Sequence, residues 1–190
     1  MKRSILFVDA CPRKESRTRE LGEYFVSRLS GEVNHLKLCS EHLLPLDENG
    51  VVARESSLSS EPNAHALSYA RGFAAADEIV IAAPCWDFSF PSILKVYFEH
   101  VSVPGIAFRY VGDNEVKGLC RAKRLTYITT AGGPIFEDAF GYGYIKALCG
   151  MYGIRNTHYV KAENLDLAGA DAPRILEDAK ARIAREIPTD

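Results

Sequence analysis

The chain has 190 residues, of which 47% are hydrophobic and 25% charged, proportions typical of a soluble globular protein with one core. A formal net charge of −2 provides no concentrated basic surface, so no nucleic-acid partner is expected. No apolar run approaches the ~18 residues of a transmembrane helix, so no membrane partner is expected either. We predict a single domain over residues 1–190.

The five cysteines stand at positions 11, 39, 85, 120 and 149. Their number is odd and no pair has CxxC spacing, so neither a disulfide framework nor a metal site is predicted. The basic start of the chain precedes an apolar run that is too short for the core of a signal peptide. A reducing, cytoplasmic location is the simplest expectation.

Strand and helix patterns alternate through the first half of the chain. Residues 4–10 are nearly all apolar, as in a buried parallel strand, and residues 21–29 carry apolar side chains at helical spacing. A weak alternation predicts a second strand at 34–39. Residues 40–61 show no period and predict a long loop, which residues 63–76 follow as a helix.

The second half continues the alternation. Strands are predicted at 78–83, 123–130 and 155–161. Helices are predicted at about 91–103, at 138–152, and around 175–183. Residues 108–114 are predicted to form an extended arm and a turn.

Five strands alternating with helices predict an α/β fold, a doubly wound five-stranded parallel sheet with helices on both faces. Of the two common strand orders, five strands favour 2-1-3-4-5, with its switch point between the first and third strands. That order places the loops at 11–18 and 84–91 side by side.

The first of these loops, residues 11–18, leads from a strand into a helix. The free N–H groups and the dipole of a helix start favour an anion. Ser16 and Thr18 can add hydroxyl donors, and Arg13 or Arg17 can add charge, so a phosphate monoester fits. Neither GxGxxG nor GxxxxGK[ST] is present. The alternatives are that Ser16 only caps the helix and that the cations are solvated.

The second loop, residues 84–91, is rich in planar side chains. It follows a buried strand, where open parallel sheets bind ligands, and predicts a flat aromatic ligand. Trp86, Phe88 and Phe136 are candidates for the apolar walls of an acceptor site, and the alternative for them is ordinary packing.

A third loop, residues 129–134, contains two adjacent glycines, Gly132 and Gly133. Glycines allow backbone to approach a ligand closely and to offer N–H groups to its acceptor atoms. A plain strand-to-helix turn is the alternative. All three loops are expected at the same edge of the sheet, and this coincidence favours a ligand site.

Several spaced motifs carry a family resemblance. They are Pro84-x-Trp86-Asp87-Phe88-x-x-Pro91-x-x-Leu94-Lys95, then Phe108-x-Tyr110, then Gly118-Leu119, then Thr130-x-Gly132-Gly133. In this order they resemble the flavodoxin-like NAD(P)H:quinone reductases and FMN-dependent NADH-azoreductases over nearly the whole chain. The resemblance implies a flavodoxin-like fold, a homodimer with one FMN per subunit, and NADH or NADPH as electron donor.

The resemblance also implies roles for particular positions. The residues implied to hold the phosphate are Cys11, Ser16, Arg17 and Thr18, with Arg13 added from the loop's own charge. The residues implied to flank the flavin ring are Pro84, Cys85, Trp86, Asp87 and Phe88. The residues implied to face the pyrimidine edge of the ring are Thr130, Ala131, Gly132 and Gly133.

The pattern of the family differs at four positions, Cys11, Cys85, Trp86 and Asp87, and two of these differences bear on the site. Cys11 stands where a serine is common, which removes one hydroxyl donor to the phosphate. Asp87 stands where an asparagine is common, and an ionised carboxylate cannot donate a hydrogen bond to the flavin. Either the Asp87 side chain turns away and only its backbone N–H is used, or the carboxyl is protonated; we expect the first.

The predicted function is therefore two-electron, ping-pong reduction of a small aromatic acceptor, such as a quinone, azo dye or nitroaromatic compound. The cofactor carries the electrons, and backbone N–H groups near Gly132 and Gly133 stabilise negative charge on it. Two alternatives remain open. One is a non-enzymatic flavin electron carrier, and the other is a thiol-based redox protein that uses Cys11 and Cys85.

Overall fold

A parallel sheet runs through the centre of the computed structural model, which describes residues 2–60, 64–112, 115–136 and 138–187. Within these residues the sheet has five strands, in the spatial order β2 (Glu32–Lys37), β1 (Ser4–Asp9), β3 (Glu78–Ala82), β6 (Arg124–Thr130) and β7 (Asn156–Ala162). Every neighbouring pair is parallel. In order along the chain this is 2-1-3-4-5, so the predicted α/β topology is confirmed.

Alternate residues of each inner strand supply two separate cores. In β1, Ile5 and Phe7 pack on one side of the sheet, while Leu6 and Val8 pack on the other. This is the two-residue period of a strand, and it requires both faces to be apolar. The edge strand β2 has a mostly exposed pattern, which explains why its sequence signal was weak.

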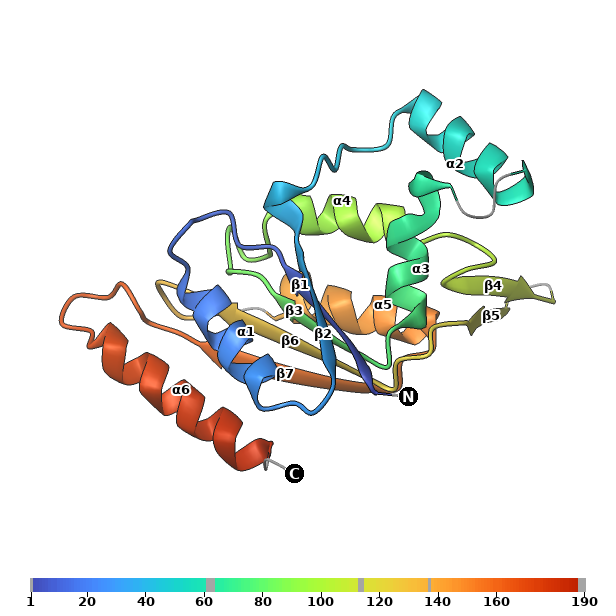
Figure 1. Ribbon diagram of the computed structural model, residues 1–190. Helices are drawn as coiled ribbons and strands as arrows, with labels where there is room; N and C mark the ends of the chain where they lie inside the picture. The colour runs from blue at the N-terminus through green and yellow to red at the C-terminus, as the bar shows by residue number, and fades with distance from the viewer. Residues whose placement is uncertain (1, 61–63, 113–114, 137, 188–190) are drawn as a thin grey trace.

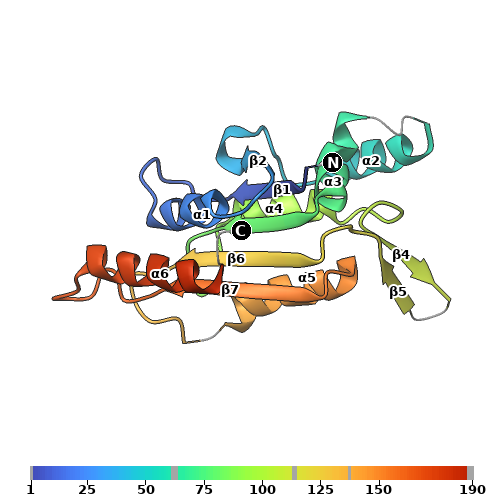
Figure 2. The same ribbon diagram turned by 60° about the horizontal axis from the view of Figure 1, so that its bottom comes forward.

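Helices cover both faces of the sheet (Figures 1 and 2). The helices α1 (Arg17–Ser27) and α6 (Ala172–Glu186) contribute to one core. The helices α3 (Ser68–Ala75), α4 (Ser92–Val101) and α5 (Tyr144–Tyr152) contribute to the other. Among the described residues, no helix is both long enough and apolar enough to cross a bilayer.

The predicted long loop at 40–61 is wrong over most of its length, because residues Glu48–Ser60 form the helix α2. This helix contains no buried residue and lies at the edge of the molecule in Figure 1. A helix without an apolar face has no helical period for a sequence pattern to reveal. Residue 61 lies outside the described residues.

Smaller differences concern the ends of elements. The helix predicted over residues 63–76 is observed as a short 3₁₀ turn, His65–Leu67, followed by α3. Residue 63 lies outside the described residues. The predicted helix at 138–152 begins with a π-helical turn, Ala139–Gly143, before α5. The extended arm is part of a hairpin, β4 (Phe108–Val111) and β5 (Glu115–Gly118), whose residues 113–114 lie outside the described part.

Replacing Gly118 at the end of β5 by alanine is expected to destabilise the protein. An added Cβ would clash with the backbone of Tyr152 and Gly153, and overpacking of this kind costs about 1–3 kcal/mol. Urea unfolding of Gly118→Ala measures the loss. The matched control is Gly72→Ala in α3, where the new Cβ would meet nothing within 4 Å beyond the helix's own backbone and about 0.5–1 kcal/mol should be gained. Equal midpoints for the two variants would contradict the close contact of β5 with the end of α5.

Candidate functional site

A cavity of about 880 Å³ opens at the carboxyl ends of the strands. Its walls come from residues 12–20 with Glu23, residues 84–86, residues 130–132 and residues 165–166. The three loops predicted from the sequence therefore meet around one space, and a fourth loop, after β7, joins them. The hairpin β4–β5 lies at the other end of the sheet in both ribbon views (Figures 1 and 2).

Backbone hydrogen bonds beyond the strand ends hold these loops together. The Ala10 N–H donates to the carbonyl of Ala82 at 2.9 Å, so the first and second loops leave the sheet as neighbours. The Cys85 N–H donates to the carbonyl of Thr130 at 2.9 Å, which joins the second loop to the third. The cavity thus opens beside the switch point of the sheet, between β1 and β3.

The first loop brings the start of α1 to the cavity. Ser16 is the N-cap, and its Oγ accepts a hydrogen bond from the Arg19 N–H at 3.3 Å. The Ser16 side chain thus caps the helix, and it also lines the cavity. Arg13, Lys14 and Arg17 bring positive charge to the wall. Together with the helix dipole, these cations favour an anion here.

Thr18 and Thr130 join the first loop to the third. Their hydroxyl oxygens are 2.6 Å apart, and both side chains are buried. One hydroxyl donates to the other, so the accepting hydroxyl keeps its own hydrogen for a ligand. Thr18 therefore has a structural role in addition to its place on the cavity wall.

Cys11 does not line the cavity. It is 1% exposed, and its thiol lies 3.5 Å from the Ala82 carbonyl, to which it donates. Burial raises the pKa of the Cys11 thiol to about 12 and also raises the pKa of Cys85. A reactive cysteine needs a lowered pKa, so both shifts speak against thiol-based redox chemistry.

The aromatic loop contains a tight, strained turn. Trp86 and Ser89 exchange two backbone hydrogen bonds, at 3.0 and 2.8 Å. Between them Asp87 has φ 49° and Phe88 has φ 65°. Two positive φ values define a type I′ turn, which normally takes glycine or asparagine. A phenylalanine in this conformation is strained, and strain of this kind gathers at functional sites.

Of the aromatic loop, only residues 84–86 line the main cavity. Asp87 instead lines a second hollow of about 640 Å³, which shares Pro12 and Trp86 with the first. Phe88 is 62% exposed and lies outside both hollows. Asp87 therefore does not line the main cavity.

Two further predicted residues stay off the walls of the main cavity. Gly133 follows the lining residues 130–132, and its carbonyl accepts a hydrogen bond from the Asn164 N–H at 3.2 Å. Phe136 is 81% exposed. Its side chain projects from the surface instead of forming a wall of the described monomer.

The sequence reading missed the fourth loop. The Asp166 carboxylate lies 2.7 Å from Nη1 of Arg17, across the mouth of the cavity. The Asp166 N–H donates to the carbonyl of Gly132, and the Leu165 N–H donates to that of Ala131. The sequence did contain a signal for this loop, because Leu165 and Asp166 follow the fifth strand closely, and the loops after parallel strands all lie at the same edge of the sheet.

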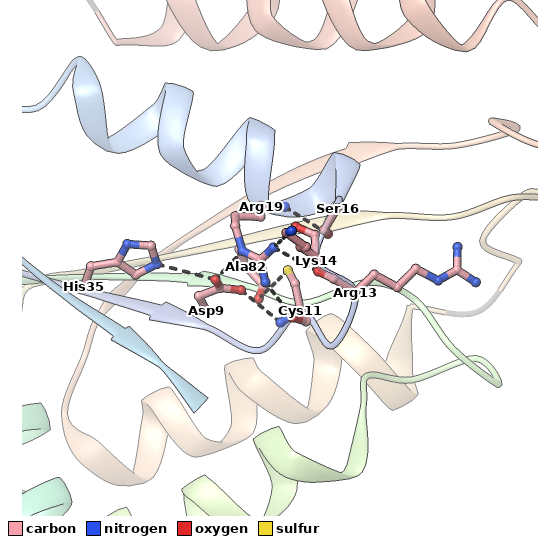
Figure 3. A network of polar contacts seen from close by, with 8 residues as sticks. All are labelled: Asp9, Cys11, Arg13, Lys14, Ser16, Arg19, His35 and Ala82. Atoms are coloured by element: carbon pink, nitrogen blue, oxygen red, sulfur yellow. Dashed lines mark hydrogen bonds and ion pairs between the residues drawn. The ribbon is translucent and has the colours of Figure 1, made fainter. Parts of the chain in front are cut away.

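The sequence reading also missed a buried charge pair beneath the first loop (Figure 3). Asp9, at the end of β1, has a completely buried side chain, and its Oδ2 accepts from Nε of Arg19 at 2.5 Å. This hydrogen bond raises the pKa of Arg19. His35 of β2 places Nε2 3.5 Å from the same carboxylate oxygen. The Arg19 side chain is therefore mostly buried.

Removing one hydroxyl of the Thr18–Thr130 pair is expected to destabilise the protein. In Thr18→Val the buried Thr130 hydroxyl loses its partner, which costs about 1–3 kcal/mol in free energy of unfolding. The double variant Thr18→Val/Thr130→Val should lose less than the sum of the two single losses, because no partner is left behind. Strictly additive losses in urea unfolding would show that the two hydroxyls do not interact.

The model of a family described as "Flavodoxin-like fold" matches residues 3–187 of this chain. A protein from Clostridium acetobutylicum named FMN-dependent NADH:quinone oxidoreductase 2 is 33% identical over 186 residues, covering 92% of each chain. A Clostridium beijerinckii protein named FMN-dependent NADH:quinone oxidoreductase is 34% identical, covering 92% of this chain and 93% of its own.

Solved structures share the architecture. An azoreductase from Bacillus anthracis str. Sterne superposes with a TM-score of 0.84 at 21% identity, covering 97% of this chain and 98% of its own. A second structure, titled an FMN-dependent NADH-azoreductase from Bacillus anthracis str. Ames Ancestor in complex with FMN, gives a TM-score of 0.79 at 18% identity. It covers 97% of this chain and 99% of its own. At these identities the likeness concerns the fold.

Proposed function

This chain belongs to the family with the flavodoxin-like fold, and from that membership we propose that it is an FMN-dependent oxidoreductase. It passes two electrons from NADH, or NADPH, to a quinone, azo or nitroaromatic acceptor. The family resemblance predicted from the sequence motifs is confirmed. The observation that carries the proposal is the single cavity in which a cationic helix start meets an aromatic loop.

The walls of this cavity fit FMN chemically. A phosphate monoester suits the start of α1, where Arg13, Lys14 and Arg17 supply charge. A flat ring suits the wall formed by Pro84 and Trp86. The volume of about 880 Å³ lies in the range of about 300–1,000 Å³ usual for small-molecule sites.

The roles of the residues follow from these walls. Ser16, Arg17 and Thr18 would hold the phosphate, while Pro84, Cys85 and Trp86 would flank the ring. When bound, FMN supplies the electron transfer between the nicotinamide and the acceptor. The protein binds it, orients it and limits the access of water.

The glycine loop would supply N–H donors to the ring. The carbonyls of Ala131 and Gly132 accept hydrogen bonds from the loop after β7. A trans peptide directs its C=O and N–H to opposite sides, so the N–H of Gly132, a residue that lines the cavity, is directed away from that loop. Such donors stabilise negative charge that develops on a reduced ligand.

Exposed aromatic side chains favour a homodimer. Phe88, Phe136 and Phe140 are all strongly exposed, and the Ser89 Oγ donates to the Phe140 carbonyl at 2.7 Å, which brings two of the three segments together. Large apolar side chains gathered beside a site mark an interface. A second copy of the chain would cover them and complete the wall that Phe88 and Phe136 were expected to provide.

The electron-carrier alternative is not favoured. The relatives are named as oxidoreductases, and the net charge of −2 is not the strong acidity common among flavin carriers. Catalytic turnover separates the two functions, because a carrier without a nicotinamide site does not oxidise NADH.

The purified protein is expected to bind FMN and to become colourless with NADH or NADPH under anaerobic conditions. Adding menadione should restore the oxidised spectrum and support continuous oxidation of the nicotinamide. Visible absorption spectra measure both steps. A purified protein that does not bind added FMN would refute the proposal. A protein that binds FMN but does not oxidise NADH or NADPH would favour the electron-carrier alternative.

Arg17→Gln is expected to weaken FMN binding by about tenfold or more, because a hydrogen bond to a charged group is lost. Riboflavin lacks the phosphate, so its affinity should stay the same. Quenching of flavin fluorescence measures both constants. The matched control is Arg185→Gln, at an exposed position of α6 outside the cavity walls. An unchanged FMN affinity in Arg17→Gln would show that Arg17 does not bind the phosphate.

A further inference from the structure

We propose that Arg19 is a positioning residue that holds the first loop in the conformation that binds the FMN phosphate. The inference rests on the proposed function and deepens it. Arg19 lies in the first turns of α1, and its side chain extends beneath the loop instead of into solvent (Figure 3).

The guanidinium of Arg19 uses four of its five N–H donors within this loop and its floor. Nε donates to Oδ2 of Asp9 at 2.5 Å, and Nη2 donates to the carbonyl of Cys11 at 2.7 Å. Nη1 donates to the carbonyls of Arg13 and Lys14 at 2.9 and 2.8 Å. One planar group thus fixes three carbonyls between residues 11 and 14.

These bonds determine where the N–H groups of the loop are directed. The Arg13 carbonyl belongs to the same peptide unit as the Lys14 N–H, and the Lys14 carbonyl to the same unit as the Glu15 N–H. Because trans peptides direct C=O and N–H to opposite sides, both N–H groups are directed away from Arg19. Lys14 and Glu15 line the cavity, so these two donors can serve a phosphate.

Asp9 is the charge partner of Arg19, and the set of acceptors around this guanidinium suits an arginine and not a lysine. Its buried carboxylate accepts from the Cys11 N–H at 2.9 Å and from Arg19, and it balances the charge of the guanidinium. Arg19 therefore contributes geometry rather than net charge to the site. A lysine has three donors on one compact group and cannot span a carboxylate and three carbonyls. The Arg13 side chain, in contrast, extends away from the network in Figure 3.

The test compares FMN with riboflavin in Arg19→Lys, which keeps the charge but loses the planar fork. We expect FMN to bind at least tenfold more weakly than to the wild type, with riboflavin affinity changed less than twofold. Fluorescence quenching measures both affinities, and thermal unfolding without ligand reports the fold. Arg185→Lys on α6 is the matched control and should change neither affinity.

Three results would overturn the inference. FMN affinity equal to that of the wild type would show that charge alone suffices. Equal losses for FMN and riboflavin would show a general structural role. A wild-type protein that binds FMN no better than riboflavin would refute the proposed phosphate site itself, which distinguishes that failure from the other two.

If Arg19→Lys does not fold, Asp9→Asn keeps Arg19 and removes its charge partner. The unbalanced charge of Arg19 by itself favours the phosphate, so a fall of at least threefold in the ratio of FMN to riboflavin affinity, which we expect, reports the lost geometry of the loop. An unchanged ratio would contradict the inference.

Discussion

The backbone hydrogen bonds of the sheet continue past the last residues of β1 and β3. Ala10 bonds to Ala82, and Cys85 to Thr130, both beyond or at the ends of regular strands. Because the five strands of the central sheet run parallel, each loop that follows one of them must emerge at this one edge. The cavity, the cationic helix start and the aromatic turn all depend on this shared register. No single loop could form the site alone.

The charged residues at this edge of the sheet have two different roles, since some stabilise the first loop and others face the cavity. Asp9 and Arg19 neutralise each other beneath the loop, where an unpaired charge would be costly. Arg17 meets Asp166 at the exposed mouth, where solvent weakens the pair and a more highly charged phosphate can compete for the arginine. The same short segment therefore contains one cation committed to structure and another available to a ligand.

Several features follow from the sequence alone. The apolar runs of β1 and β3 identify buried strands, since a strand covered on both faces has few polar positions. The alternation of strands and helices then gives the parallel sheet and its order. The motifs from Pro84 to Lys95 and around Gly132 give the family. These signals are local, so they can be read without knowing which segments meet.

Only the tertiary structure decides which side chains share the cavity. Asp9 and Arg19 are ten positions apart, and Arg17 and Asp166 are 149 apart, so no local pattern relates either pair. Cys11 and Thr18 are both in the predicted loop, yet only Thr18 lines the wall. The helix α2 contains no buried residue and has no apolar period to detect. The sequence by itself determined the fold and the edge of the sheet where the cavity opens. The assignment of each side chain to wall, support or surface required the packed chain, because burial and distance arise only when remote segments come together.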